Sequence, residues 1–172
     1  VDPRERVLET EFGTRHKVDV ANVIPPQSAG TIAIEAGLAN DTGWVPVNTR
    51  SFEARAAQGI HVIGDANIPG PMPKSGYIAH STAKQAVASA MAGLRGEAPP
   101  EALYFNTCYS HVGTDYGISV VGIFRPNADG TAIAEVPNSG GVSPRGDLPE
   151  QRRLEAIYAD TWYEAITKSM FG

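Results

Sequence analysis

Residues 59–65 read GIHVIGD, and this stretch carries most of the fold prediction. It indicates a short strand that ends at Gly-Asp and buries its branched aliphatic residues in a parallel sheet, namely Ile60, Val62 and Ile63. Ligands of open α/β sheets bind at the carboxyl ends of such strands. Gly64 has no Cβ and lets the backbone approach a ligand closely. The Asp65 carboxylate can accept hydrogen bonds from sugar-alcohol hydroxyls. The stretch therefore predicts a strand end that binds a ligand.

A loop and then a helix are expected after this strand. The helix opens near Lys74-Ser75-Gly76, and its first amides lack partners within the helix and carry partial positive charge. We expect Ser75, Gly76 and Tyr77 to offer backbone N–H groups to a ligand. Lys74 adds positive charge in the same place if it faces the ligand, and an exposed surface lysine is the alternative.

Residues 76–95 give the clearest helical pattern in the chain. Small apolar residues recur at helical spacing and predict one face that packs closely on a flat surface such as a sheet, namely Ala79, Ala83, Ala86, Ala90 and Leu94. Gly96 follows as a carboxyl cap, and Pro99-Pro100 prevent the helix from continuing. This proline-rich stretch is the expected domain boundary.

The remaining elements are predicted from alternation, helical spacing and turn residues. Upstream, we expect strands over 6–12 and 16–24, a short helix over 28–38 and a short strand over 44–47. Downstream of residue 100, we expect strands over 103–109, 117–124 and 131–136 and a long helix over 149–170. The downstream pattern predicts a small antiparallel sheet with one helix.

Composition excludes several classes of function. The net charge of −5 is spread along the chain without runs, which argues against a nucleic-acid partner. No apolar stretch approaches the ~18–20 residues that span a bilayer. Cys108 is the single cysteine, so this segment holds no internal disulfide and no cysteine-rich metal site. The four histidines lack metal-ligand spacing, and we predict no metal.

Two longer runs point to a known family. Residues 57–82 read AQGIHVIGDANIPGPMPKSGYIAHST, and residues 103–126 read LYFNTCYSHVGTDYGISVVGIFRP. NDTGW at 40–44 and PNSGGVSP at 137–144 add to the same order of motifs. The chain resembles the flavoprotein subunit of flavocytochrome c sulfide dehydrogenase, a family related to sulfide:quinone oxidoreductases. The resemblance extends from about residue 18 to residue 172.

The resemblance implies an α/β fold, the end of a two-dinucleotide-fold FAD enzyme, followed by a small α+β terminal domain. Residues 1–48 would end the second, NAD-like dinucleotide domain. Residues 49–98 would be the carboxyl-terminal part of the FAD-binding domain, and residues 99–172 the terminal domain of the family. The phosphate-binding GxGxxG turn is absent from these residues. We therefore expect an amino-terminal remainder of the flavoprotein to supply it.

The resemblance also assigns chemistry to particular residues. Asp65 and Gly64 would contact FAD at its ribityl chain, and the helix start at 74–77 would face the pyrimidine side of the isoalloxazine. Cys108 in the NTCYS run would pair with a cysteine of the amino-terminal part, and sulfide would attack that disulfide over the flavin. Trp162 would pack at the flavin or the sulfide pocket. Electrons would pass to a c-type cytochrome subunit in the periplasm.

Alternatives stay open at this stage. Cys108 among aromatic residues also suits an apolar filler of the core, and Trp162 suits a core position on an amphipathic helix. The same architecture also serves quinone-reducing enzymes and NAD(P)H-dependent disulfide reductases. A different class is a non-catalytic interaction or dimerisation fragment that binds no flavin.

Overall fold

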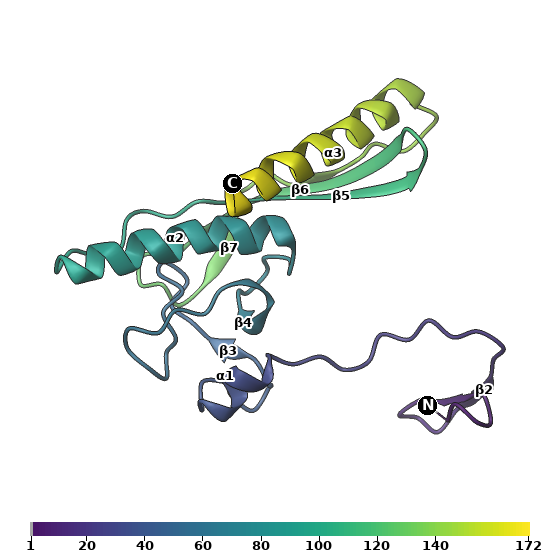
Figure 1. Cartoon of the computed structure of the whole chain (residues 1–172), viewed down its shortest axis with the longest axis horizontal. Coiled ribbons are helices and arrows are strands. Elements are labelled where there is room, and N and C mark those ends of the chain that lie inside the picture. Colours follow the sequence, from purple (N-terminus) through teal and green to yellow (C-terminus); the bar gives the residue numbers. More distant parts are fainter. Residues whose placement is uncertain (1) are drawn as a thin grey trace.

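The computed structural model describes residues 2–172, which form a small hairpin, a central α/β region and a terminal sheet with a long helix (Figure 1). The hairpin pairs β1 (Val7–Glu9) with β2 (Arg15–Lys17) in antiparallel register. An extended segment separates it from the rest of the molecule. Both strands were predicted, but they are much shorter than expected. Nothing covers the residues beyond them, since Val20 is 91% exposed and Ile24 is 83% exposed.

The central region follows the extended segment. Its elements are α1 (Thr31–Glu35), β3 (Val45–Pro46), the single-turn 3₁₀ helix η1 (Gly64–Ala66), β4 (Asn67–Ile68) and α2 (Gly76–Leu94). Strands β3 and β4 pair in parallel over two residues each. The predicted short helix, short strand and long helix are therefore confirmed, and the first two are shorter than expected.

The predicted buried strand at residues 60–63 is wrong. His61 forms only an isolated bridge with Glu53, and Ile60 and Ile63 are 46% and 41% exposed. A fully buried parallel strand needs a neighbouring strand along its whole length, and no strand within residues 2–172 lies along this segment. The Gly-Asp pair consequently lies in the turn η1 and not at the end of a strand.

The terminal region is an antiparallel sheet. Strands β5 (Tyr104–Gly113) and β6 (Tyr116–Pro126) form a long hairpin, and β7 (Ile133–Glu135) and β8 (Gly141–Val142) pair with the other edge of β6. The helix α3 (Pro149–Phe171) ends the chain. The predicted small α+β arrangement is confirmed. The two-dinucleotide-fold context and the domain boundaries at 48 and 98 stay predictions.

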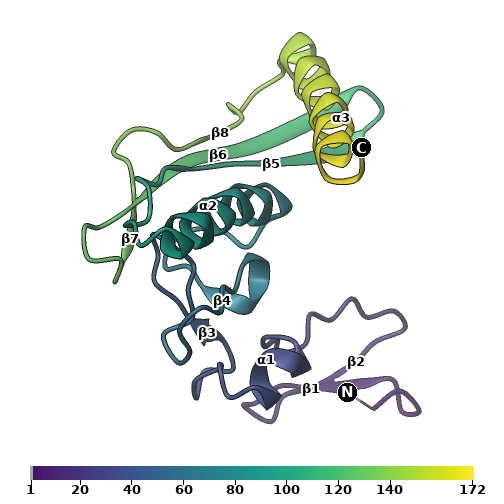
Figure 2. The ribbon, with the colours of Figure 1, turned by 60° about the vertical axis from the view of Figure 1, so that its left-hand side comes forward.

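Strand β5 presents its two faces to two different helices. Cα pairing places Cys108 beside Val120 and Asn106 beside Gly122, whereas Tyr109 lies beside Ser119 on the opposite face. Helix α3 packs on the Tyr109 face, and the start of α2 contacts Asn106 on the other. Figures 1 and 2 show the two helices on either side of the sheet.

The core joins the central region to the terminal sheet. Tyr104 is 1% exposed, packs edge-on against Phe52 at 5.4 Å and donates from its hydroxyl to the Thr49 carbonyl at 2.7 Å. The buried cluster around this pair extends from Ala29 to Ile133. A buried tyrosine hydroxyl needs a partner, and this one fixes the start of β5 over the central region.

Helix α2 has the predicted bounds but not the predicted buried face. Its fully buried positions are Ile78, Thr82, Ala86, Ser89 and Ala92, and of the predicted alanine face only Ala86 is among them. Leu94 is 83% exposed. The sheet and the central region both contact this helix, so two neighbours decide its burial, whereas the periodicity argument assumed one flat surface.

Helix α3 approaches the sheet most closely at Gly117. A Cβ built on this glycine would lie 2.5 Å from the backbone nitrogen of Ala156. Real Cβ atoms do not approach backbone so closely, so any side chain here would push helix and strand apart. The absence of a side chain at this position sets the distance between α3 and β6.

We expect Gly117→Ala to lower the free energy of unfolding by about 2 kcal/mol, because an added methyl group overpacks this contact. Denaturant unfolding measures the effect. Gly113→Ala on β5 is the matched control, since its Cβ would meet only Tyr116 Cβ at an ordinary 3.7 Å. Equal stability of the two variants would contradict the close approach of α3.

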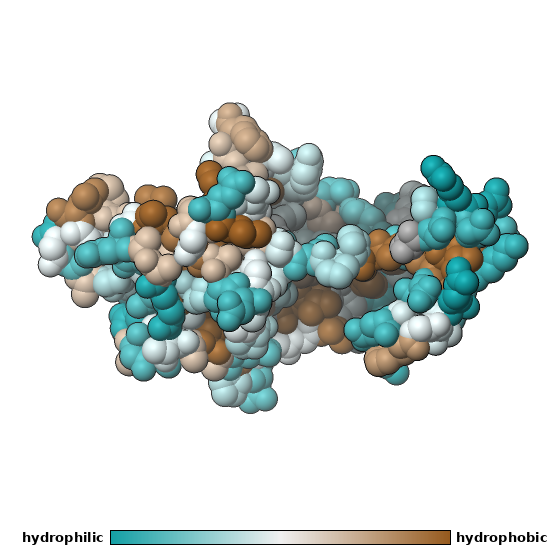
Figure 3. All heavy atoms as spheres, turned by 90° about the horizontal axis from the view of Figure 1, so that it is seen from below, coloured by the Kyte–Doolittle hydropathy of each residue, from teal (hydrophilic) through white to brown (hydrophobic). Residues whose placement is uncertain are grey.

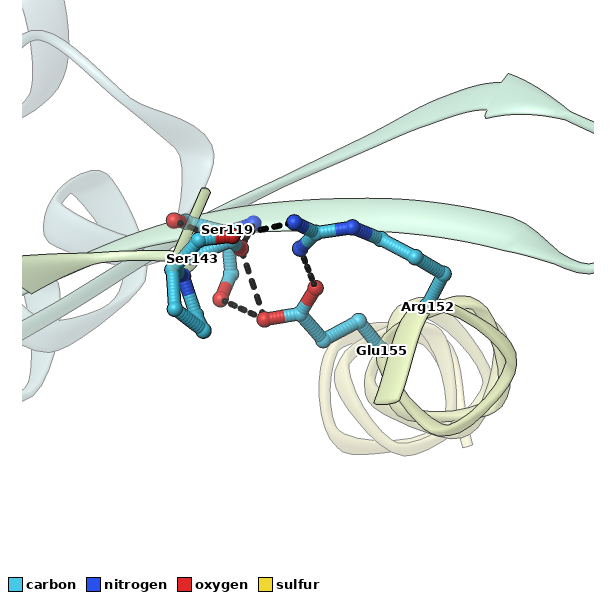
Figure 4. A network of polar contacts seen from close by, with 5 residues as sticks. Ser119, Ser143, Arg152 and Glu155 are labelled. Atoms are coloured by element: carbon cyan, nitrogen blue, oxygen red, sulfur yellow. Dashed lines mark hydrogen bonds and ion pairs between the residues drawn. The ribbon is translucent and has the colours of Figure 1, made fainter. Parts of the chain in front are cut away.

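A buried polar network holds α3 to the sheet (Figure 4). Arg152 donates to the Glu155 carboxylate at 3.0 Å and to the Pro144 carbonyl. The same carboxylate accepts from Ser143 at 2.6 Å and from Ser119 at 3.2 Å. Burial alone would raise the pKa of Glu155, but these hydrogen bonds and the guanidinium together lower it.

Glu155→Gln keeps the shape of the side chain and removes its charge. At neutral pH we expect Tm to fall by roughly 8 °C, because the buried guanidinium loses its charged partner. The exposed Glu150→Gln is the control.

The pH dependence follows from the lowered pKa of Glu155. The ordinary value is 4.5, so the carboxylate stabilises the fold above that pH and loses its contribution as pH falls through the lower folded-state pKa. Wild type and Glu155→Gln should therefore approach the same Tm in acid. A constant difference at every pH would argue against the ionised pair.

Apolar side chains on the surface gather in several separate patches, seen from below in Figure 3. The most exposed large ones include Phe12 at 87% and Ile32 at 83%. Within residues 2–172, no helix combines the length and the apolar character that crossing a membrane requires.

Candidate functional site at the start of helix α2

The amino end of α2 is fixed by a side-chain cap. Ser75 lies in extended backbone, and its Oγ accepts the Ile78 amide at 3.1 Å. The amides of Gly76 and Tyr77, the first two of the helix, have no intrahelical acceptor. These two N–H groups and the helix dipole give the helix start a partial positive charge that favours electron-rich or anionic ligand atoms.

The same serine connects the helix start to the cysteine. Ser75 Oγ donates to Asn106 Oδ1 at 2.6 Å, and Asn106 Nδ2 lies 3.4 Å from the Sγ of Cys108. Asn106 is 3% exposed, whereas Cys108 is half-buried. The fold thus brings together residues 75 and 108, which were predicted separately as cofactor-binding and catalytic.

Trp162 from α3 reaches the same helix start. Its ring stacks on Tyr77 with centroids 5.5 Å apart and planes 10° apart, and it lies 6.3 Å from the Tyr109 ring. A Cβ on Gly76 would come within 3.8 Å of the indole. Burial raises the pKa of Tyr109, and the nearby Tyr77 adds to the effect. The result is an aromatic wall beside the free amides.

The Gly64–Asp65 turn packs against α2. Gly64 adopts φ +66°, and a Cβ on it would lie 3.6 Å from Ala79 Cβ, so glycine suits both the backbone and the close contact. Asn67, which is 1% exposed, donates to the carbonyls of Val62 and Gly64 and holds the turn. The Asp65 side chain itself is exposed.

Lys74 stabilises the Gly64–Asp65 turn. Its Nζ donates to the backbone carbonyls of Asp65 and Asn67 and lies 3.7 Å from the centroid of the Trp44 ring. Burial lowers the pKa of Lys74, while the neighbouring Asp65 carboxylate acts in the opposite direction. In this structure the Lys74 ammonium therefore stabilises the Gly64–Asp65 turn. Its predicted contact with a cofactor stays a prediction.

A groove of about 550 Å³ begins at Tyr77 and Trp162 and continues between α2, α3 and β5. Its floor includes Leu103 and Phe105, and the α2 side carries His80 and Lys84. Burial and the nearby Lys84 lower the pKa of His80. His111 instead pairs with Asp160 on α3 at 3.1 Å. No group of three or more His, Cys, Asp or Glu side chains within residues 2–172 could hold a metal ion.

Sequence reasoning missed Asn106 and Tyr109. Asparagine is depleted in strands. Its presence at 106, between Tyr104 and Cys108, could therefore have predicted a side chain with a specific hydrogen-bond partner. Tyr109 carries no sequence signal beyond being one of several aromatic residues around Cys108. Its contact with Trp162 depends on where α3 lies, and no local pattern encodes that position.

The start of α2 thus has a side-chain cap, an aromatic wall on one face of β5 and a half-buried cysteine on the other. In a comparison with protein families, residues 100–171 match the family model described as "Flavocytochrome c sulphide dehydrogenase, flavin-binding". The match covers β5 to β8 and α3, so this part of the chain is similar to the flavin-binding region of that family. The cofactor is FAD.

The chemistry of the side chains fits FAD. The exposed Asp65 carboxylate accepts hydrogen bonds from hydroxyls, which the ribityl chain supplies. The amides of Gly76 and Tyr77 would be suitable donors for the carbonyl and ring-nitrogen acceptors of a flavin's pyrimidine edge. The stacked rings of Tyr77 and Trp162 suit an aromatic neighbour.

We expect Lys74→Met to lower the free energy of unfolding by about 1 kcal/mol, because two charge-assisted hydrogen bonds and a cation–π contact are lost at a partly exposed site. Denaturant unfolding measures the loss. Lys84→Met, an exposed lysine on α2, should change stability far less. If both variants unfold at the same denaturant concentration, Lys74 does not hold the turn.

Proposed function

We propose that this chain is the carboxyl-terminal part of an FAD-dependent sulfide dehydrogenase. It supplies Asp65 and the helix start to the flavin and Cys108 to the reaction. The observation that carries the proposal is the contact chain Ser75–Asn106–Cys108, which connects the helix start to the only sulfur nucleophile of the segment. The match of residues 100–171 supports the same assignment.

The chemistry begins at a disulfide between Cys108 and a cysteine of the amino-terminal remainder. Hydrosulfide attacks one sulfur, so a new S–S bond forms as the old one breaks, leaving a persulfide and a thiolate. Bound FAD supplies a two-electron acceptor. This chain contributes the helix start, whose positive end stabilises negative charge on the reduced cofactor.

The aromatic wall has a separate role in this proposal. Trp162 and Tyr77 would shield one side of the reaction site from water, because their stacked rings form an apolar wall at the end of the groove. Exclusion of water strengthens the electrostatic effect of the helix start. In the proposal, Trp162 therefore contacts the flavin or the sulfide pocket.

The electron acceptor follows from the family name, which joins the flavin domain to a cytochrome c. We propose a c-type cytochrome subunit as the partner and the periplasm as the location. A quinone or NAD(P)H-linked disulfide reductase of the same architecture is the second candidate. The groove beside Tyr77, with apolar Leu103 and Phe105 and polar His80, is the observation that favours a quinone.

Cys108→Ser in the complete flavoprotein tests the proposal. We expect FAD to stay bound, as seen in its visible absorbance, and sulfide oxidation to fall about a thousandfold or more, because the disulfide cannot form. Ser110→Ala, two residues along the same face, is the control and should keep normal turnover. Near-normal sulfide oxidation by Cys108→Ser would reduce Cys108 to a packing residue.

A further inference from the structure

The side-chain amide of Asn106 is held in one orientation by its neighbours. It is 3% exposed on β5, between the start of α2 and Cys108. Ser75 Oγ already accepts the Ile78 amide, so its own hydrogen is free to point to Asn106 Oδ1 at 2.6 Å. The carbonyl end of the amide is thereby directed to the helix start. The NH₂ end is left to face the sulfur.

The distances at the sulfur agree with this orientation. Asn106 Nδ2 lies 3.4 Å from Cys108 Sγ, and Oδ1 lies farther away at 3.6 Å. A protonated thiol can point its weak S–H donor at Oδ1. A thiolate can only accept, so it needs the Nδ2 hydrogen. The thiol and the thiolate of Cys108 can therefore both form a hydrogen bond with the Asn106 amide.

The charged groups near the cysteine are engaged elsewhere. His111 pairs with Asp160, and Lys74 donates to the carbonyls of the Gly64–Asp65 turn. Tyr109 points to the opposite face of the sheet, toward Trp162. Both polar contacts of Cys108 Sγ within residues 2–172 are with Asn106.

We propose that Asn106 is a catalytic residue whose side-chain amide donates a hydrogen bond to the Cys108 thiolate. The proposal rests on the proposed function, because it gives the amide a role only once the disulfide has opened. When hydrosulfide attacks the sulfur of the partner cysteine, the persulfide forms on that cysteine and Cys108 leaves as the thiolate. A donor already oriented by Ser75 stabilises the negative charge of that thiolate without rearrangement.

Asn106→Asp and Asn106→Leu together separate this role from a structural one, because the aspartate adds a negative charge that also opposes the thiolate and the leucine does not. The aspartate keeps the size of the side chain and the acceptor for Ser75 but has no donor for the sulfur. We expect the thiolate population of Cys108 at a given pH to fall at least tenfold, which corresponds to about 1.4 kcal/mol. Asn106→Leu, of similar volume, should also lose about tenfold. Ser75→Ala, which frees the amide to rotate, should give a smaller loss.

The measurement uses the complete flavoprotein with its disulfide reduced. Ultraviolet absorbance of the thiolate is followed over a series of pH values, and each variant is compared with its own Cys108→Ser counterpart. Ser110→Ala is the control and should match wild type. Thermal unfolding shows which variants are folded.

The outcomes distinguish this proposal from the proposed function. Unchanged thiolate populations in folded Asn106→Asp would overturn the role of the amide, whatever the enzyme's turnover. If Asn106→Asp and Asn106→Leu do not fold, the thiolate population of Ser75→Ala is the test, and an unchanged population in that variant would overturn the role of the amide. Loss of thiolate in these variants, combined with normal sulfide oxidation by Cys108→Ser, would support the hydrogen bond and refute the disulfide mechanism.

Discussion

One strand with two occupied faces organises this protein. Strand β5 must fit α3 on the face that carries Tyr109 and the start of α2 on the face that carries Asn106. Because successive side chains alternate between faces, a change of register by one residue would exchange the two environments and bury Cys108 under α3. Tyr104 prevents this slip, since its hydroxyl bonds the Thr49 carbonyl and its ring packs on Phe52.

The fixed register of β5 determines the geometry of the candidate site. With β5 fixed, Asn106 meets Ser75, and the serine caps α2 at the position where two amides are left free. On the other face, the contact of α3 with Gly117 and the buried pair of Arg152 and Glu155 set the position of Trp162. Packing far from the cysteine thus decides which groups surround it.

The sequence predicted the elements better than their surroundings. The serine before α2, the glycine after it and the alternation in β5 and β6 are local signals, and each marked an element correctly. The buried faces of the helices depend on partners distant in sequence. Arg152 and Glu155 are spaced like an exposed surface pair, yet both are buried because Ser119 and Ser143 provide further hydrogen bonds.

In the candidate site, too, local motifs were recognised from the sequence and contacts between distant segments were not. Cys108, Trp162 and the helix start were singled out from the motifs, and the fold places Cys108 and Trp162 beside the helix start on opposite faces of β5. The apolar run before Asp65 was misread because an isolated run of branched residues cannot reveal whether neighbouring strands exist. Asn106 was overlooked because its hydrogen-bond partner Ser75 lies 31 residues away at the start of α2, and no local pattern connects the two.

The stacked rings of Tyr77 and Trp162 have a consequence for the solubility of the protein. Strand β5 is the outer strand of its sheet and runs for ten residues, so its unpaired backbone groups could recruit a strand from another molecule. The two rings come from helices on opposite faces and meet beside this edge. Bulky aromatic groups there obstruct the approach of a foreign strand. The rings that line the candidate site would thereby also shield this edge of the sheet.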